Sequence, residues 1–153
     1  MKTFLKLLLP LAVATSAIAY DAEKAAIFHG FYKNFNQKAC AETTLFLDAE
    51  EAMKRVGDHE NTLFLDIRTP GERSVIGLNI PGSVAIPLNR LFEPANLDTL
   101  PTEKNIVIVC HSGTRAVMAA TALKMVGFKK LRVLAGGIRA LAAVNTPKTA
   151  PMR

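Results

Sequence analysis

The residues in this sequence that are best placed to do chemistry are Cys110 and Arg115. Residues 106–109 (IVIV) form a continuous β-branched run, which is typical of a strand buried on both faces of a parallel sheet. Cys110 directly follows this run, and Arg115 opens an Ala-rich stretch that predicts a helix. Between them lie Ser112, Gly113 and Thr114, small residues that let backbone N–H groups turn toward the sulfur. Converging N–H groups and a helix N-terminus stabilise a thiolate, so the pattern predicts a nucleophilic cysteine.

The alternative is a structural cysteine, since free cysteines are among the most buried residues in proteins. Here, however, Cys110 ends the predicted strand instead of lying within it. An arginine and the start of a helix follow. These three features together favour a reactive site.

The rest of the chain must position this loop. A length of 153 residues indicates one domain, and 50% hydrophobic residues suffice to build a core. Strand-like runs alternate with helix-like runs, which predicts an α/β fold with about five parallel strands and helices on both faces. The expected strands are 43–47, 62–65, 83–86, 106–109 and 131–134, and the expected helices are 49–57, 115–125 and 138–144, with helical pieces broken by Pro94 over 88–100.

Residues 1–19 resemble a signal peptide and are not expected to belong to the fold. Lys2 and Lys6 precede a short apolar stretch, and residues 17–19 (Ala-Ile-Ala) fit a cleavage site before Tyr20. We therefore expect export to the periplasm, cleavage after Ala19 and no stable membrane insertion afterwards. A membrane anchor is the alternative, but the apolar stretch is short for a span.

Residues 20–42 form an extension before the expected domain at 43–144, and residues 145–153 form a tail without pattern. Apolar residues recur at helical spacing in the extension, interrupted by Gly30, which predicts one helix or two short ones. The extension either packs on the domain or docks a partner.

A second pair of candidate residues, Asp66 and Arg68, follows the predicted strand 62–65. Open α/β sheets place their ligands at this end of their strands. We expect Asp66 to give structural support by capping the next turn. Arg68 is either paired with Asp66 or lines the entrance to the site and binds substrate.

The two cysteines, Cys40 and Cys110, allow a disulfide in an oxidising compartment. We expect Cys110 to be free, because its loop is suited to chemistry. Cys40 is then either structural or an occasional redox partner. No Cys or His spacing indicates a metal site, and no cofactor is expected.

Charge is unevenly distributed along the chain, whose formal net charge is +6. Residues 20–100 carry 8 Lys and Arg against 12 Asp and Glu, whereas residues 101–153 carry 9 Lys and Arg against one acid. A positive field around the cysteine loop would attract small anions, although a solvated surface is an equal alternative. No basic patch with interleaved aromatic residues points to nucleic acid.

With these motifs in place, the sequence resembles the rhodanese family over about residues 43–144. Four segments match in the family's order and near its spacing: LFLDIRTPGER, IPGSVAIPL, IVIVCHSGTRAVMAATAL and LAGGIRAL. The chain is similar to small exported rhodaneses with a single domain. The resemblance implies a thiosulfate sulfurtransferase-like enzyme.

The resemblance also implies roles for individual residues. Cys110 matches the nucleophile that carries sulfur as a persulfide, and Arg115 matches the arginine that closes its loop. The backbone N–H groups of the loop match a cradle for the donor; its residues are His111, Ser112, Gly113, Thr114 and Arg115. Asp66 and Arg68 match the family's Asp-x-Arg. The implied donor is a small sulfur anion such as thiosulfate, polysulfide or a persulfide, and the acceptor is a small thiophile or a protein.

Loop length separates this family from its phosphatase relatives. Cys110 and Arg115 enclose four residues, whereas cysteine phosphatases carry five between the same two residues. A smaller ring of donors suits sulfur better than a tetrahedral phosphate.

The sequence departs from the family pattern at three positions. Asn79 stands where the family usually has His, and His111 follows the nucleophile where other residues are common. The usual Trp after the Gly-Gly turn is missing, and we expect Leu141 to fill its space. A proton-transfer role for His111 is an alternative, but a thiolate in an anion cradle needs no base.

Two further functions stay open at this point. Cys110 could carry sulfur delivered by a partner protein, with the extension as the docking surface. It could instead do thiol-redox chemistry with Cys40, which requires Cα atoms within about 7 Å.

Overall fold

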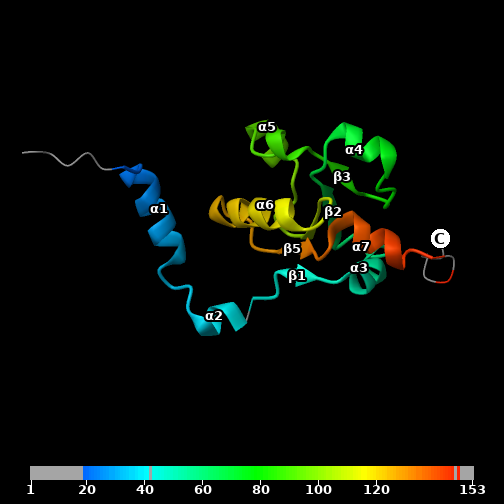
Figure 1. Cartoon of the computed structure of the whole chain (residues 1–153), viewed down its shortest axis with the longest axis horizontal. Coiled ribbons are helices and arrows are strands. Elements are labelled where there is room, and N and C mark those ends of the chain that lie inside the picture. Colours follow the sequence, from blue (N-terminus) through cyan, green and yellow to red (C-terminus); the bar gives the residue numbers. More distant parts are fainter. Residues whose placement is uncertain (1–18, 42, 147, 149–153) are drawn as a thin grey trace, which may run out of the picture. The chain divides into compact units, whose positions relative to one another are not determined.

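We describe a computed structural model of the chain for residues 19–41, 43–146 and 148. The expected signal peptide falls almost entirely on residues 1–18, which lie outside the described residues. The chain divides into two units, Met1–Cys40 and Ala41–Arg153 (Figure 1). Among the described residues, no helix is both long and apolar enough to cross a membrane.

The N-terminal unit contains α1 (Ala22–Tyr32) and the start of α2 (Gln37–Ala41). Asp21 caps α1, because its carboxylate accepts the N–H of Lys24 at 3.0 Å. The extension therefore forms two helices, and Gly30 lies within α1 instead of interrupting it. Packing or docking by the extension stays a prediction.

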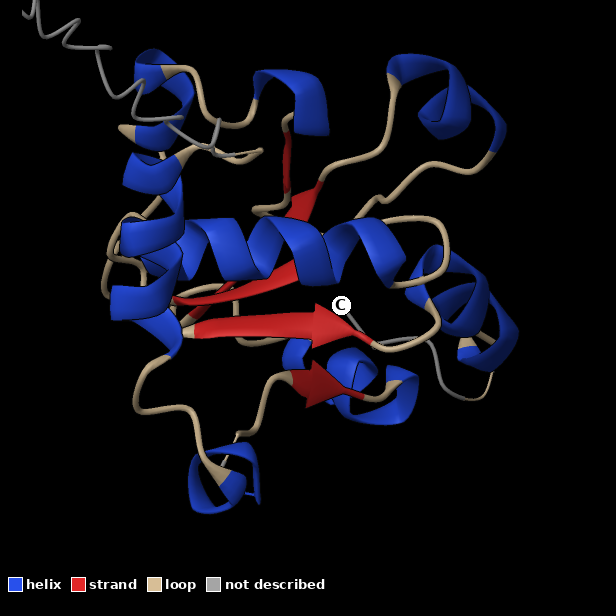
Figure 2. Cartoon of the chain, turned by 60° about the vertical axis from the view of Figure 1, so that its left-hand side comes forward, coloured by secondary structure: helices blue, strands red, loops and turns tan. Residues whose placement is uncertain are grey.

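The second unit contains one parallel five-stranded sheet with strand order β1-β5-β4-β2-β3 (Figure 2). The strands are β1 (Phe46–Leu47), β2 (Thr62–Asp66), β3 (Val84–Ala85), β4 (Asn105–Val109) and β5 (Leu131–Leu134). Asp66 of β2 is in register with Val109 of β4. The ends of these two strands, where the sequence analysis placed its candidate residues, therefore lie side by side.

Helices cover both faces of this sheet, as the sequence predicts. The helical elements are α3 (Ala49–Arg55), α4 (Pro70–Val75), the 3-10 turn η1 (Leu88–Arg90), α5 (Pro94–Leu97), α6 (Thr114–Met125) and α7 (Gly137–Val144). The helical pieces expected over 88–100 are η1 and α5, and the break between them falls just before Pro94, because the first turn of a helix tolerates a residue without N–H. Helix α4 was not predicted.

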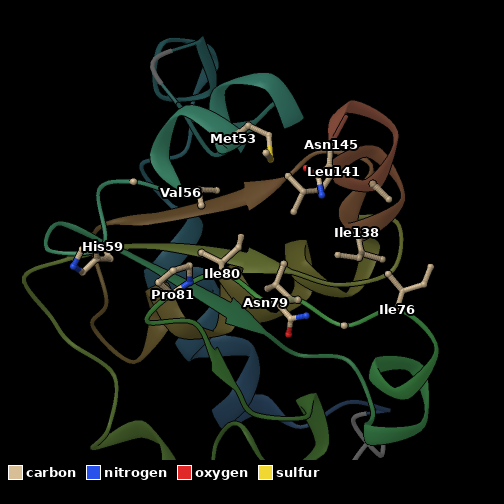
Figure 3. A pocket seen from close by; sticks show the side chains of 14 residues that line it. Met53, Val56, His59, Ile76, Asn79, Ile80, Pro81, Ile138, Leu141 and Asn145 are labelled. Carbon is tan, nitrogen blue, oxygen red and sulfur yellow. The ribbon is translucent and has the colours of Figure 1, made fainter. Parts of the chain in front are cut away.

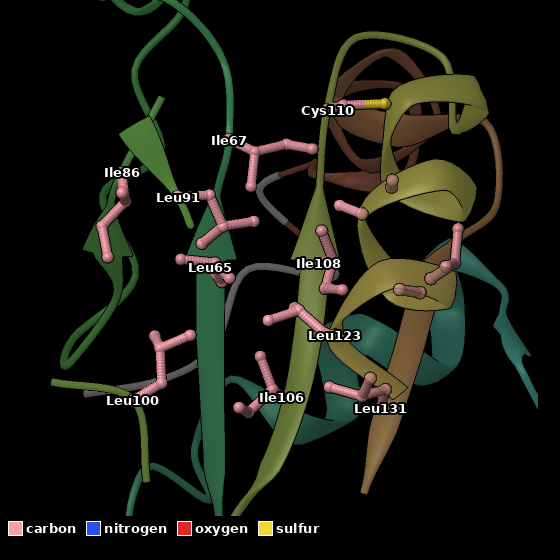
Figure 4. Packing of buried hydrophobic residues seen from close by; sticks show 14 of the residues in the cluster. Leu65, Ile67, Ile86, Leu91, Leu100, Ile106, Ile108, Cys110, Leu123 and Leu131 are labelled. Atoms are coloured by element: carbon pink, nitrogen blue, oxygen red, sulfur yellow. The ribbon is translucent and has the colours of Figure 1, made fainter. Parts of the chain in front are cut away.

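Alternate residues of β4 enter two separate apolar cores. Ile106 and Ile108 pack with α6 on one face, where Leu123 is fully buried (Figure 4). Val107 and Val109 pack with α3 and α7 on the other face. Because β4 is buried on both sides, its carboxyl end is held firmly, and the loop that follows starts from a fixed point.

Candidate active site

Cys110 lies directly after β4, and its side chain points toward the start of α6 (Figure 4). The backbone N–H of Gly113 donates a hydrogen bond to its Sγ at 3.1 Å. Gly113 has a φ of 104°, a conformation that favours glycine and that allows the loop to turn back on the sulfur. The loop therefore directs a backbone donor at the thiol, as the sequence predicts.

The sulfur is buried. Cys110 is 1% exposed and belongs to the core cluster beneath α6, a degree of burial that matches the alternative of a structural cysteine. The next residues of the loop, His111 and Ser112, are exposed. The thiol thus lies beneath a polar surface loop, and the inward turn of the loop backbone at Gly113 covers it.

The loop leads straight into the N-terminus of α6. This helix has 12 residues and begins at Thr114, with Gly113 as its N-cap. No side chain caps it, so its first N–H groups are not occupied by a capping oxygen. The positive end of a three-turn helix therefore faces the loop that carries Cys110, which favours negative charge on the sulfur.

The turn between β5 and α7 contacts the backbone of Cys110 and holds it in place. The N–H of Ile138 donates to the carbonyl oxygen of Cys110 at 2.8 Å. A Cβ on Gly137 would lie 2.5 Å from that oxygen and equally close to the carbonyl group of His111. The sequence pattern of residues 136–137 predicts only a turn, whereas in the structure Gly137 allows the backbone of α7 to approach the backbone of the cysteine loop.

The Arg115 side chain is bound to a carboxylate. Its guanidinium forms a two-pronged ion pair with Glu72 of α4, in which Nη1 donates to Oε2 at 2.9 Å and Nη2 donates to Oε1. This hydrogen bond with Arg115, followed by the one from the Thr69 N–H, lowers the pKa of Glu72 to about 2. The pair with Glu72 also raises the pKa of Arg115, and the nearby charge of Cys110 contributes to that rise.

Glu72 was missed by the sequence analysis, although a local signal was present. Thr69 and Glu72 form a capping box at the start of α4, with Pro70 in the first turn. The Thr69 N–H donates to Glu72 Oε2 at 3.0 Å, and the Glu72 N–H donates to Thr69 Oγ1 at 3.2 Å. Thr-x-x-Glu is a recognisable helix start. It predicts α4 and places Glu72, but it does not reveal that Arg115 is the partner.

Arg68 takes the first of its two expected roles. Its Nε donates to Asp66 Oδ1 at 2.9 Å, and its Nη2 donates to Asp66 Oδ2 at 2.6 Å. Both side chains are 2% exposed. Because the Arg68 guanidinium is closed off from solvent and held by a carboxylate, we withdraw its predicted role in binding substrate. Asp66 provides structural support as the sequence predicts: besides pairing with the Arg68 guanidinium, its Oδ1 accepts the backbone N–H of Arg68 at 3.0 Å and so caps the turn after β2.

A groove with a volume of about 680 Å³ lies on the α3 and α7 side of the sheet (Figure 3). Cys110 does not line it. Asn79 and Leu141, two positions where the sequence departs from the family pattern, both line it. Leu141 was expected to fill the space of a missing Trp, but the groove remains open beside it.

Cys110 is a free thiol. The side chain of Cys40 lies outside the described part of the chain, so a redox role for Cys40 stays a prediction. Among the residues that the structure describes, no group of three or more His, Cys, Asp or Glu side chains is placed to hold a metal ion.

Comparison with known proteins agrees with this geometry. Residues 48–143 match the model of the rhodanese-like domain family. A sulfurtransferase of Allochromatium vinosum is 33% identical over 105 residues, which cover 69% of this chain and 94% of the relative. YrkF of Bacillus subtilis, a protein provisionally named as a sulfur carrier, is 40% identical over 90 residues, covering 58% of this chain and 46% of YrkF.

The fold has solved counterparts. The crystal structure of a single-domain sulfurtransferase of Saccharomyces cerevisiae superposes with a TM-score of 0.58 at 19% identity, covering 72% of this chain and 98% of the yeast protein. At this identity, the similarity shows the fold alone. The family match and the Allochromatium relative go further: the chain belongs to the rhodanese-like domain family of sulfurtransferases.

Proposed function

We propose that this protein transfers sulfane sulfur from a donor to a thiophilic acceptor through a persulfide on Cys110. The observation that carries the proposal is the hydrogen bond from the Gly113 N–H to Cys110 Sγ, at the N-terminus of α6, a helix that has no side-chain cap. Backbone donors and a helix N-terminus stabilise a thiolate, and they stabilise a terminal persulfide anion in the same way.

The proposed reaction has two displacement steps. The Cys110 thiolate attacks the outer sulfur of the donor, a new S–S bond forms, and the donor's own S–S bond breaks. The remainder leaves with the electron pair; from thiosulfate it is sulfite. A thiolate or cyanide acceptor then attacks the outer sulfur of the persulfide and restores the Cys110 thiolate. No external oxidant or reductant is needed, because sulfur changes partners without net electron transfer.

Intact-mass spectrometry tests this proposal. Treatment with a sulfane donor should add the mass of one sulfur atom to the wild-type protein and none to Cys110→Ser. Cys40→Ser is the matched control, because it removes the other cysteine and should still gain one sulfur. Equal labelling of the wild type and Cys110→Ser would refute the assignment of Cys110.

A sulfur-carrier role is the second candidate, and the similarity to YrkF favours it. In this role Cys110 receives sulfur from a partner protein and turns over small donors slowly. Fast transfer from a protein persulfide, together with weak thiosulfate:cyanide activity, would identify a carrier. Comparable rates with both donors would identify a general sulfurtransferase.

We also propose that the protein is exported and processed. The support is the pattern of residues 1–19, in which an apolar stretch follows two lysines and ends at a small-residue cleavage site. Expression in a bacterial host followed by N-terminal sequencing of the periplasmic fraction should yield a mature chain that begins at Tyr20. Full-length protein in the cytoplasmic fraction alone would contradict export.

A further inference from the structure

Both arginines that the sequence places at the site are bound to carboxylates. Arg68 is held by Asp66 through three contacts between their side chains, with both residues buried. Arg115 is held by Glu72 through two, with about a third of each side chain exposed. Two positive groups next to the loop are thus matched by two negative ones.

This pairing changes what a donor meets at Cys110. Arg115, the last residue of the loop, is close enough to Cys110 for the cysteine to contribute to the raised pKa of Arg115, so we expect the leaving portion of a sulfane donor to approach this guanidinium. Glu72 remains ionised at neutral pH, because its pKa is about 2. A dianion at this position is therefore attracted by one guanidinium, but it is repelled by one carboxylate and by the Cys110 thiolate.

Building on the sulfur transfer proposed above, we infer that this site takes sulfane donors of low charge in preference to the thiosulfate dianion, and that Glu72 sets this specificity. The donor class is an organic thiosulfonate or a thiol persulfide. Glu72 acts through Arg115, so it is a positioning residue that also contributes a charge.

Two donors with the same chemistry and different charge isolate this effect. Methanethiosulfonate carries one negative charge; Cys110 takes its outer sulfur, and methanesulfinate leaves with the electron pair. Thiosulfate carries two negative charges; Cys110 takes its outer sulfur, and sulfite leaves with the electron pair. In both reactions one S–S bond breaks, one forms, and the total charge is unchanged.

The experiment measures kcat/KM for each donor with cyanide as the acceptor. The thiolate of 2-mercaptoethanol gives the intrinsic reactivity ratio of the two donors without a protein. For the wild-type protein, we expect the ratio of kcat/KM for methanethiosulfonate to kcat/KM for thiosulfate to be about tenfold higher than the reactivity ratio of the free thiolate. The reason is that the Arg115 guanidinium is already paired, so the negative charge of its carboxylate partner lies near the donor. A ratio equal to that of the free thiolate would overturn the inference.

Glu72→Gln is the decisive variant, because the amide oxygen can keep the capping box while the charge is lost. If removal of the charge raises kcat/KM for methanethiosulfonate, the monoanion, about threefold, it should raise kcat/KM for thiosulfate, the dianion, about tenfold, since the interaction scales with donor charge. Glu93→Gln is the matched control: it removes the carboxylate from the exposed Arg90–Glu93 pair and should leave both donors unchanged.

The outcomes separate this inference from the proposed function. If the wild-type protein takes no sulfur from either donor, sulfur transfer at Cys110 fails, and the specificity fails with it. If both donors transfer sulfur to Cys110, but Glu72→Gln changes the two kcat/KM values by the same factor or lowers the value for thiosulfate, only the inferred specificity fails. Thermal melting verifies that the variant folds; should it not fold, the wild-type ratio against the free thiolate decides alone.

Discussion

The α-carbon of Gly137 lies so close to the carbonyl oxygen of Cys110 that no side chain fits between them. A Cβ at this position would lie 2.5 Å from that oxygen. The neighbouring Ile138 N–H binds the same oxygen at 2.8 Å. The first turn of α7 and the cysteine loop therefore share one backbone contact, and the position of the thiol depends on it.

Gly137→Ala should both destabilise the protein and slow sulfur loading. Gly137 has a φ of 61°, so alanine adds backbone strain to the clash, and together we expect a loss of about 2–4 kcal/mol in the free energy of unfolding. Urea denaturation and the rate of sulfur addition to Cys110 measure the two effects.

Gly127→Ala is the control for strain without a clash. Gly127 has a φ of 110°, and a Cβ there would meet nothing within 4 Å. It should cost about 1 kcal/mol and leave the loading rate unchanged. An equal loss of rate in both variants would show that the close approach at Gly137 has no role in placing the thiol.

The pair of Glu72 and Arg115 predicts a loss of stability at acid pH. In the folded state the pKa of Glu72 is lowered from 4.5 to about 2, so its carboxylate binds protons less readily than it does in the unfolded chain. Stability from this group is complete above pH 4.5 and is lost as the pH falls toward 2. Glu72→Gln should flatten that part of the profile, as measured by urea midpoints between pH 5 and 2. An unchanged acid slope in Glu72→Gln would assign the loss to other carboxylates.

Asp66→Asn should be far more damaging than removal of a surface carboxylate. It leaves the guanidinium of Arg68 buried without a counter-charge, which costs about 3–5 kcal/mol. Glu93→Gln, in the exposed pair with Arg90, should cost about 1 kcal/mol or less. Equilibrium unfolding of the two variants gives the comparison, and similar losses would mean that Arg68 finds another partner or water.

His111→Gln should leave sulfur loading nearly intact. The side chain of His111 is exposed, and the described hydrogen bond to Cys110 Sγ comes from the Gly113 backbone. We expect a loading rate within about threefold of the wild type, below the contribution typical of general acid–base catalysis. A loss of a hundredfold or more would instead make His111 a proton-transfer residue.

Much of the fold follows from local patterns in the sequence. The IVIV run predicted a strand buried on both faces, and β4 sends alternate residues into two cores. Alternating strands and helices predicted the parallel sheet. The order of strand, cysteine, loop and helix placed Cys110 and Gly113 correctly, because each of these contacts spans only a few residues.

The features that sequence reasoning did not predict depend on distant parts of the chain. Glu72 and Arg115 lie 43 positions apart, and nothing in either segment names the other as its partner. The depth of Cys110 depends on how α6 packs over the sheet. Whether Arg68 points inward or outward is decided by the tertiary surroundings of β2. The start of α4 is different, since its capping box could have been read from the sequence.

One carboxylate of this protein serves two structures at once. Glu72 Oε2 accepts a hydrogen bond from the Thr69 N–H at the start of α4, and it also accepts a hydrogen bond from Arg115 Nη1 beside the cysteine loop. Fraying of that short helix and release of the guanidinium are therefore one local fluctuation, and amide exchange in the first turn of α4 would report on both.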